Sequence, residues 1–157
     1  LFYLRFVSSD KYNQWKKILN TPSYKSWSGL AFENLCMQHT SQIEVALKID
    51  GINTRISSWH HNATDEMNGA QIDLLLDRDD KIINVCEIKY YTNKLIITKD
   101  LMEKLNTKIA AFQFFTETKK SIFPVIICPF GIHKNKYADA FNENIVTLND
   151  LFQISTN

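Results

Sequence analysis

Features that would place this chain in a specialised class of protein are missing from its sequence. No apolar run approaches the roughly 18 residues of a membrane-spanning helix, and no signal-peptide pattern is found. The three cysteines are widely separated and each lies in an apolar stretch, which predicts reduced core thiols. The four histidines lack the spacing of a zinc site. We therefore expect a cytoplasmic protein without a membrane association.

The chain also lacks a large net charge, with a formal value of +1 at pH 7. The charges are nevertheless segregated, because residues 65–80 carry six acids and one arginine whereas residues 89–120 carry seven lysines and three acids. An acidic pocket beside a basic rim would suit a metal-dependent enzyme that acts on a polyanion. Two ordinary solvated surfaces would give the same distribution, so charge alone leaves both interpretations open.

The rest of the composition is that of a globular domain. The 157 residues are 45 % hydrophobic and 22 % charged, which suits one domain with a substantial core. The chain opens at Leu1 with an apolar segment and no methionine. We therefore expect it to be the C-terminal domain of a longer protein.

Hydrophobic periodicity and turn residues predict alternating helices and strands. Helices are expected over about 10–19, 27–38, 42–48 and 98–116, and strands over about 52–59, 71–77, 81–89, 121–128 and 145–148. Polar residues 23–28 are expected to separate the first two helices. Because a helix between strands normally makes a parallel crossover, this order predicts an α/β fold, a three-layer sandwich with a mixed central sheet flanked by helices.

Two adjacent strands carry the residues that most suggest chemistry. Alternation puts Asp73 on one face of its strand, and Glu87 and Lys89 on the same face of the next strand of the hairpin. If Asp77 lies opposite Lys81, Asp73 is diagonal to Glu87, at a distance that a metal ion can bridge. The opposite face is also apolar, so both faces of the sheet should be covered.

Carboxylates in such a sheet need partners, because an unpaired buried charge is costly. Two carboxylates that point at one spot repel each other unless a cation lies between them, and a divalent ion coordinated by oxygen meets this need. The pattern therefore predicts a metal site at Asp73 and Glu87, with Lys89 facing the same spot.

Two helices are each expected to direct a charged side chain inward. In the segment 27–38, Leu30, Glu33 and Met37 share one stripe, so Glu33 is expected to face inward. Thr98 is expected to cap the segment 98–116, whose apolar stripe includes Lys108. Lys108 is therefore expected to point toward the sheet.

These residues form a pattern that resembles a known group of enzymes. Glu33 on a first helix, Asp73 on a strand, Glu87-Ile88-Lys89 on its hairpin partner and Lys108 on a later helix resemble the PD-(D/E)XK nuclease superfamily of restriction-endonuclease-like folds. The segments 27–33 (WSGLAFE), 69–73 (GAQID) and 86–89 (CEIK), together with Trp59, resemble the nuclease-like domain at the C-terminus of certain bacterial AAA-type ATPases. The resemblance runs from about residue 27 to the end of the chain. It departs from the superfamily pattern at residues 70–72, where no proline precedes the aspartate.

The resemblance implies a DNA endonuclease that leaves a 5′-phosphate. Mg²⁺ or Mn²⁺ would be held by Asp73, Glu87 and the backbone carbonyl of Ile88, with Glu33 as a further ligand. Lys89 would position the attacking water and stabilise charge that develops on phosphorus.

The resemblance also implies an organisation and partners. Residues 1–25 would be a connector from an upstream ATPase domain, and residues 26–157 the nuclease-like domain. Lys108 would contact substrate phosphate. DNA is the expected partner, and a homodimer is common among duplex-cutting enzymes of this fold.

The acids and lysines also have purely structural interpretations. A salt bridge between Asp73 and Lys89 would leave Glu87 without a partner, so the metal role is favoured. Glu33 would alternatively pair with Arg55 or a lysine. Lys108 would alternatively lie along apolar surface with its ammonium group in solvent.

Other residues near the expected site are expected to have structural or surface roles. Asp77 is expected to be solvated at the turn. Packing or surface positions are expected for Trp59, His61, Tyr90 and Tyr91. The alternative function is a catalytically inactive module that binds nucleic acid or docks against the ATPase.

Overall fold

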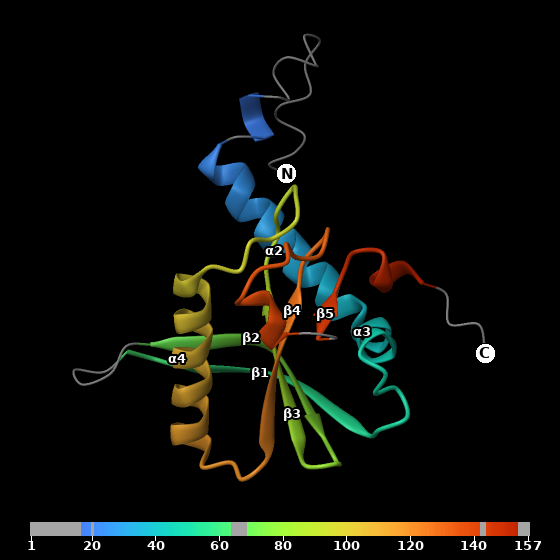
Figure 1. Cartoon of the computed structure of the whole chain (residues 1–157), viewed down its shortest axis with the longest axis vertical. Helices are drawn as coiled ribbons and strands as arrows, with labels where there is room; N and C mark the ends of the chain where they lie inside the picture. The colour runs from blue at the N-terminus through green and yellow to red at the C-terminus, as the bar shows by residue number, and fades with distance from the viewer. Residues whose placement is uncertain (1–16, 20, 64–68, 142–143, 154–157) are drawn as a thin grey trace.

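An open sheet of five strands forms the centre of the fold in this computed structural model (Figure 1). The structure describes residues 17–19, 21–63, 69–141 and 144–153. The strands, in both chain and spatial order, are β1 (Thr54–His61), β2 (Ala70–Arg78), β3 (Ile82–Ile88), β4 (Ser121–Ile127) and β5 (Ile145–Val146). The β1–β2 and β2–β3 pairs are antiparallel, and the β3–β4 and β4–β5 pairs are parallel. The predicted α/β class with a mixed sheet is confirmed.

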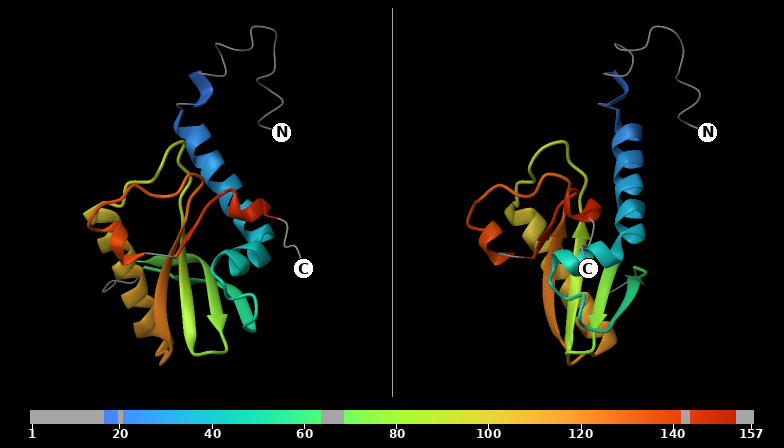
Figure 2. Two further views of the ribbon diagram at one scale, coloured as in Figure 1. Left: turned by 45° about the vertical axis from the view of Figure 1, so that its right-hand side comes forward. Right: turned by 90° about the vertical axis from the view of Figure 1, so that its right-hand side faces the viewer.

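Helices cover both faces of this sheet (Figure 2). The α-helices are α2 (Pro22–Gln38), α3 (Thr40–Ala46) and α4 (Lys99–Thr116), and two short 3₁₀ helices are η2 (Ala138–Ala140) and η3 (Asp150–Phe152). Helix α4 connects β3 to the parallel strand β4, as the crossover argument predicts. No helix in the part of the chain that the structure describes is long and apolar enough to span a membrane.

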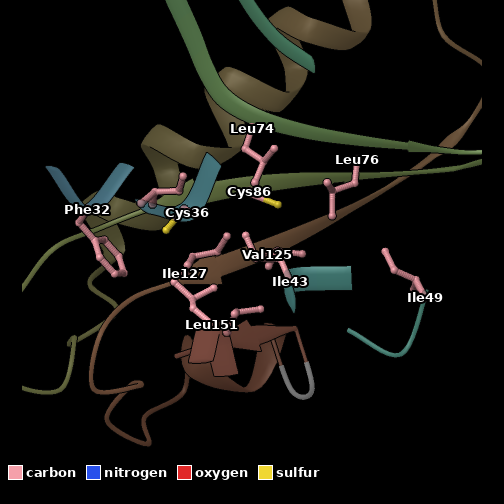
Figure 3. Close-up of a cluster of buried hydrophobic side chains, with 12 residues drawn as sticks. Phe32, Cys36, Ile43, Ile49, Leu74, Leu76, Cys86, Val125, Ile127 and Leu151 are labelled. Atoms are coloured by element: carbon pink, nitrogen blue, oxygen red, sulfur yellow. The ribbon is translucent and has the colours of Figure 1, made fainter. Parts of the chain in front are cut away.

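Two hydrophobic clusters, one on each face, form the core. Side chains of α2 and α3 pack with Leu74, Cys86 and Val125 of the sheet, as Figure 3 shows. Side chains of α4 pack on the other face with the alternate strand residues, such as Val85 and Ile126. Coverage of both faces is therefore confirmed. The three cysteines are free and buried, which also agrees with the prediction.

Helix α2 begins earlier than the sequence analysis predicts. The Thr21 hydroxyl accepts a hydrogen bond from the Tyr24 backbone N–H at 3.2 Å, and Pro22 occupies the first helical position. Residues 23–28 are therefore helical, and the prediction that they separate two helices is wrong. The expected domain boundary at residue 26 lies inside this helix. Of the helix predicted over 10–19, only residues 17–19 are described, and they are helical.

The predicted inward stripe of α2 is also wrong. Leu30 and Met37 are 60 % and 37 % exposed, whereas Phe32 and Cys36 are buried. The buried stripe is thus displaced by one residue, which leaves Glu33 at its border and half-buried.

The remaining element boundaries differ from the predictions by a few residues. Strand β1 runs two residues further than expected, so His60 and His61 are strand residues rather than the start of a loop. The loop predicted over 60–69 includes residues 64–68, which lie outside the described part. The predicted cap of α4 is confirmed, because the Thr98 hydroxyl accepts from the Leu101 N–H at 3.2 Å.

The hairpin register differs from the prediction by two residues. Asp77 pairs with Ile83 rather than with Lys81, and Leu75 pairs with Val85. Because the side-chain period of a strand is two, this shift leaves Leu74 to Leu76 on their predicted faces. Alternation also predicts Ile72 on the face of Leu74 and Leu76, and this is wrong, because Ile72 packs with Leu75 on the α4 face.

Candidate functional site

Asp73 lies at a β-bulge in β2. The β1–β2 register shifts between Ser57 and Trp59. At this point Asp73 and Leu74 of β2 lie opposite a single residue of β1. Such bulges bend a strand, redirect a side chain and are frequent next to active sites.

Asp73 lies beside Glu87 of the neighbouring strand. The β2–β3 pairing ends at Leu74 opposite Cys86, so Asp73 and Glu87 are the next residues of the two strands beyond the last pair. The Asp73 Oδ1 accepts a hydrogen bond of 2.8 Å from Gln71 Nε2. Gln71 is not among the residues predicted from the sequence, although its position two residues before Asp73 places it on the same side of an ordinary strand.

Two lysines bind Glu87, one at each carboxylate oxygen. The Lys89 Nζ lies 2.8 Å from Oε1, and the Lys108 Nζ donates to Oε2 at 2.8 Å. Glu87 is only 4 % exposed. Burial opposes its ionisation, but the hydrogen bonds and charges of Lys108 and Lys89 outweigh burial and lower the pKa of Glu87. Glu87 is therefore a buried carboxylate that stays ionised.

This arrangement decides two of the structural alternatives. Lys108 points toward the sheet as predicted, and its ammonium group pairs with Glu87 instead of extending into solvent. The argument that Glu87 would lack a partner is wrong, because it has two. Lys89 forms its salt bridge with Glu87 rather than with Asp73. Burial alone would lower the pKa of Lys89, but the hydrogen bond and charge of Glu87, together with the charge of Asp73, raise it overall.

Glu33 completes the cluster from the side of α2. Its pKa is raised by burial and by the negative charges of Asp73 and Glu87, which outweigh the opposing effects of Lys89 and Lys108. All four of the other groups therefore act electrostatically on Glu33. The alternative pairing of Glu33 with Arg55 is not present, since Arg55 lies 3.4 Å from Asp77.

Several nearby residues have structural roles. Asp77 is not simply solvated, because it pairs with both Lys120 and Arg55. Trp59 packs edge-on against Phe112, and His61 stacks on Phe115 with ring centroids 3.7 Å apart. The expected packing roles of the two β1 residues are therefore confirmed.

A groove of about 960 Å³ opens beside the acid–lysine cluster. Glu87, Lys89 and Lys108 line one part of it, and residues of α4, of the segment after β3 and of 69–71 at the start of β2 line the rest. Tyr91 and Phe114 are large rings among the lining residues. The structural reason for the groove is that α4 lies over the same face of the sheet that carries Glu87.

The donor atoms of the cluster fit a hard divalent cation by their chemistry. Glu33, Asp73 and Glu87 offer carboxylate oxygens, the ligands that Mg²⁺ and Mn²⁺ prefer. Three acids face two lysines, and burial together with the negative charges of Asp73 and Glu87 raises the pKa of Glu33. Among the described residues no three acids, histidines or cysteines already form a ready-made metal site. A bound ion would therefore require Glu87 to release or share an oxygen that now accepts from a lysine.

No family model, curated protein or solved structure matches this chain.

Proposed function

We propose that this chain is a metal-dependent phosphodiester hydrolase, a DNA nuclease domain with a restriction-endonuclease-like core. The observation that carries the proposal is a cluster of charged groups at one groove. Glu87, Lys89 and Lys108 line the groove, and Glu33 lies near enough to interact electrostatically with these three groups and with Asp73. Their order along the elements also supports membership of the PD-(D/E)XK superfamily. The acid of α2 is followed by an aspartate at a bulge, a Glu-x-Lys strand and a lysine on the crossover helix.

Asp73, Glu87 and the backbone carbonyl of Ile88 would hold the Mg²⁺ or Mn²⁺ ion, with Glu33 as a further ligand. When bound, such an ion lowers the pKa of a coordinated water and shields the charge of a phosphate. The lowered pKa of Glu87 suits this role, because a metal ligand must be deprotonated.

The two lysines have separate tasks in this proposal. Lys89 faces the groove and orients the attacking water beside the phosphate. Lys108 keeps Glu87 ionised and holds it in place from α4. Both ammonium groups stabilise negative charge that develops on the phosphoryl oxygens.

A second candidate function is a catalytically inactive module that binds nucleic acid or docks against an upstream ATPase domain. One observation favours it, namely that both oxygens of Glu87 already accept from lysines. In this case Lys89 and Lys108 are only counter-charges that permit the burial of Glu87.

Cleavage assays distinguish the two candidates. Supercoiled plasmid and circular single-stranded DNA are incubated with the protein and Mg²⁺ or Mn²⁺, beside Lys89→Ala and the control Lys119→Ala. Lys119 is an exposed lysine between α4 and β4, away from the groove. We expect Lys89→Ala to reduce cleavage by about 100-fold or more, and Lys119→Ala to cleave like the unmodified protein. The proposal fails if the unmodified protein cleaves neither substrate, or if both variants cleave equally.

A further inference from the structure

The groove beside the cluster has a mainly apolar wall with exposed aromatic rings. Leu95, Leu101 and Ala111 form part of this wall. Tyr91 and Phe114 line the same groove and are 51 % and 68 % exposed. Exposed apolar residues that gather in a concave site mark a surface that binds a ligand.

The Phe114 ring is held by its neighbours. It contacts Phe115 edge-on, with ring centroids 5.2 Å apart, and Phe115 in turn stacks on His61 of β1. The ring of Phe114 is therefore supported on one side and open to the groove on another. A supported, exposed ring is a suitable platform for a planar ligand.

The charges of the groove are balanced. Among its described lining residues are three lysines and three acids, and each of these lysines has a carboxylate partner. Lys104, for example, lies 2.9 Å from Asp100. Proteins that bind duplex DNA gain most of their affinity from lysines and arginines that neutralise several phosphates. This groove offers little such charge.

We propose that the groove binds unpaired nucleotides of a single strand, with bases against Tyr91 and Phe114 and a phosphate at the acid–lysine cluster. This inference rests on the proposed function for the identity of the polymer. Stacking on aromatic rings is available only to unpaired bases, since a duplex hides the faces of its bases. A volume of about 960 Å³ lies at the upper end of the ligand pockets of proteins, so it holds more than one base.

Binding measured without metal tests this inference separately from cleavage. Fluorescence anisotropy in EDTA compares a labelled oligothymidylate of about 12 nucleotides with a duplex and an abasic strand of the same length. We expect the oligothymidylate to bind at least about tenfold more tightly than either. Tyr91→Ala and Phe114→Ala should each weaken its binding by about 5- to 100-fold.

The matched control is Phe130→Ala, because Phe130 is also 51 % exposed but lies outside the groove. It should bind like the unmodified protein. The inference is overturned if the oligothymidylate does not bind, if the duplex or the abasic strand binds as tightly, or if the groove variants match the control.

The two proposals fail in different ways. Ring-dependent binding of the single strand without any cleavage in Mg²⁺ or Mn²⁺ would support the groove inference and refute the nuclease. Cleavage of DNA that depends on Lys89, together with binding that is unchanged in Tyr91→Ala and Phe114→Ala, would support the nuclease and refute the groove inference.

Discussion

Glu33 and Glu87 belong to one cluster, but their pKa values are shifted in opposite directions. Each oxygen of Glu87 accepts from a lysine, and these bonds outweigh the effect of burial. Glu33 forms no such bond in the described part of the chain and faces two acids. Carboxyl groups whose pKa values are shifted apart in this way commonly have different tasks in an active site.

The raised pKa of Glu33 predicts a pH-dependent effect of Glu33→Gln. The folded protein holds this proton more tightly than the unfolded chain, so the ionisation of Glu33 destabilises the fold as pH rises above the ordinary pKa of glutamate. Without metal, Glu33→Gln should therefore melt at a higher temperature than the unmodified protein at pH 7, and at the same temperature near pH 4.

Circular-dichroism melting at the two pH values measures this difference. Glu103→Gln is the control, because Glu103 is exposed and pairs with Lys99 on the surface of α4. A Glu33→Gln protein that melts lower than the unmodified one at pH 7 would show that the carboxylate has a stabilising partner, contrary to the account.

Most residues of the cluster could be predicted from the sequence, for reasons of periodicity. Alternation along a strand is enough to associate Glu87 with Lys89, and the helical stripe is enough to turn Lys108 inward. The pairing of Lys108 with Glu87 could not be predicted, because it depends on how α4 lies over the sheet. The partners of Asp77 were missed for the same reason, since Lys120 is distant in sequence.

At the scale of the elements, the two N-caps show where local signals succeed and fail. Thr98 was recognised because an apolar stripe follows it directly. Thr21 was missed because the first turn of α2 is polar and exposed, although Thr-Pro is a favourable start of a helix.

Thr98→Ala is predicted to remove the cap of α4 and lower the free energy of unfolding by about 1 kcal/mol. The matched control is Thr107→Ala, because the Thr107 hydroxyl bonds only to the Glu103 carbonyl within the exposed part of the helix. Alanine favours helix more than threonine does, so this control should change stability by less than about 0.5 kcal/mol or increase it slightly. Urea unfolding measures both, and equal losses would contradict the role of the cap.

The hairpin register could not be predicted correctly from the sequence. Its turn was placed one residue too early, because Lys81 adopts a positive φ of 67° that lysine rarely takes. The bulge at Asp73 also has no sequence signal such as glycine. The faces of Leu74, Leu75 and Leu76 were still correct, because a register shift of two residues does not change them. Ile72 lies on the other face than alternation predicts, because the bulge interrupts the alternation.

At the scale of the molecule, the order of helices and strands was enough to predict a mixed sheet with helices on both faces. The orientation of α2 could not be predicted from the sequence, because Leu30 and Met37 are apolar yet exposed. Their spacing resembled a buried stripe, and only tertiary packing identifies Phe32 and Cys36 as the inward residues.

The central claim is that acids from α2, β2 and β3 converge to hold a divalent ion. Titration with Mn²⁺, followed by the electron paramagnetic resonance signal of the free ion, tests it most directly. The account predicts that the unmodified protein binds a single Mn²⁺ per chain, that Asp73→Asn weakens binding by at least about tenfold, and that Asp79→Asn, an exposed acid of the same hairpin, does not. Absence of binding, or equal binding by Asp73→Asn and the unmodified protein, would contradict it.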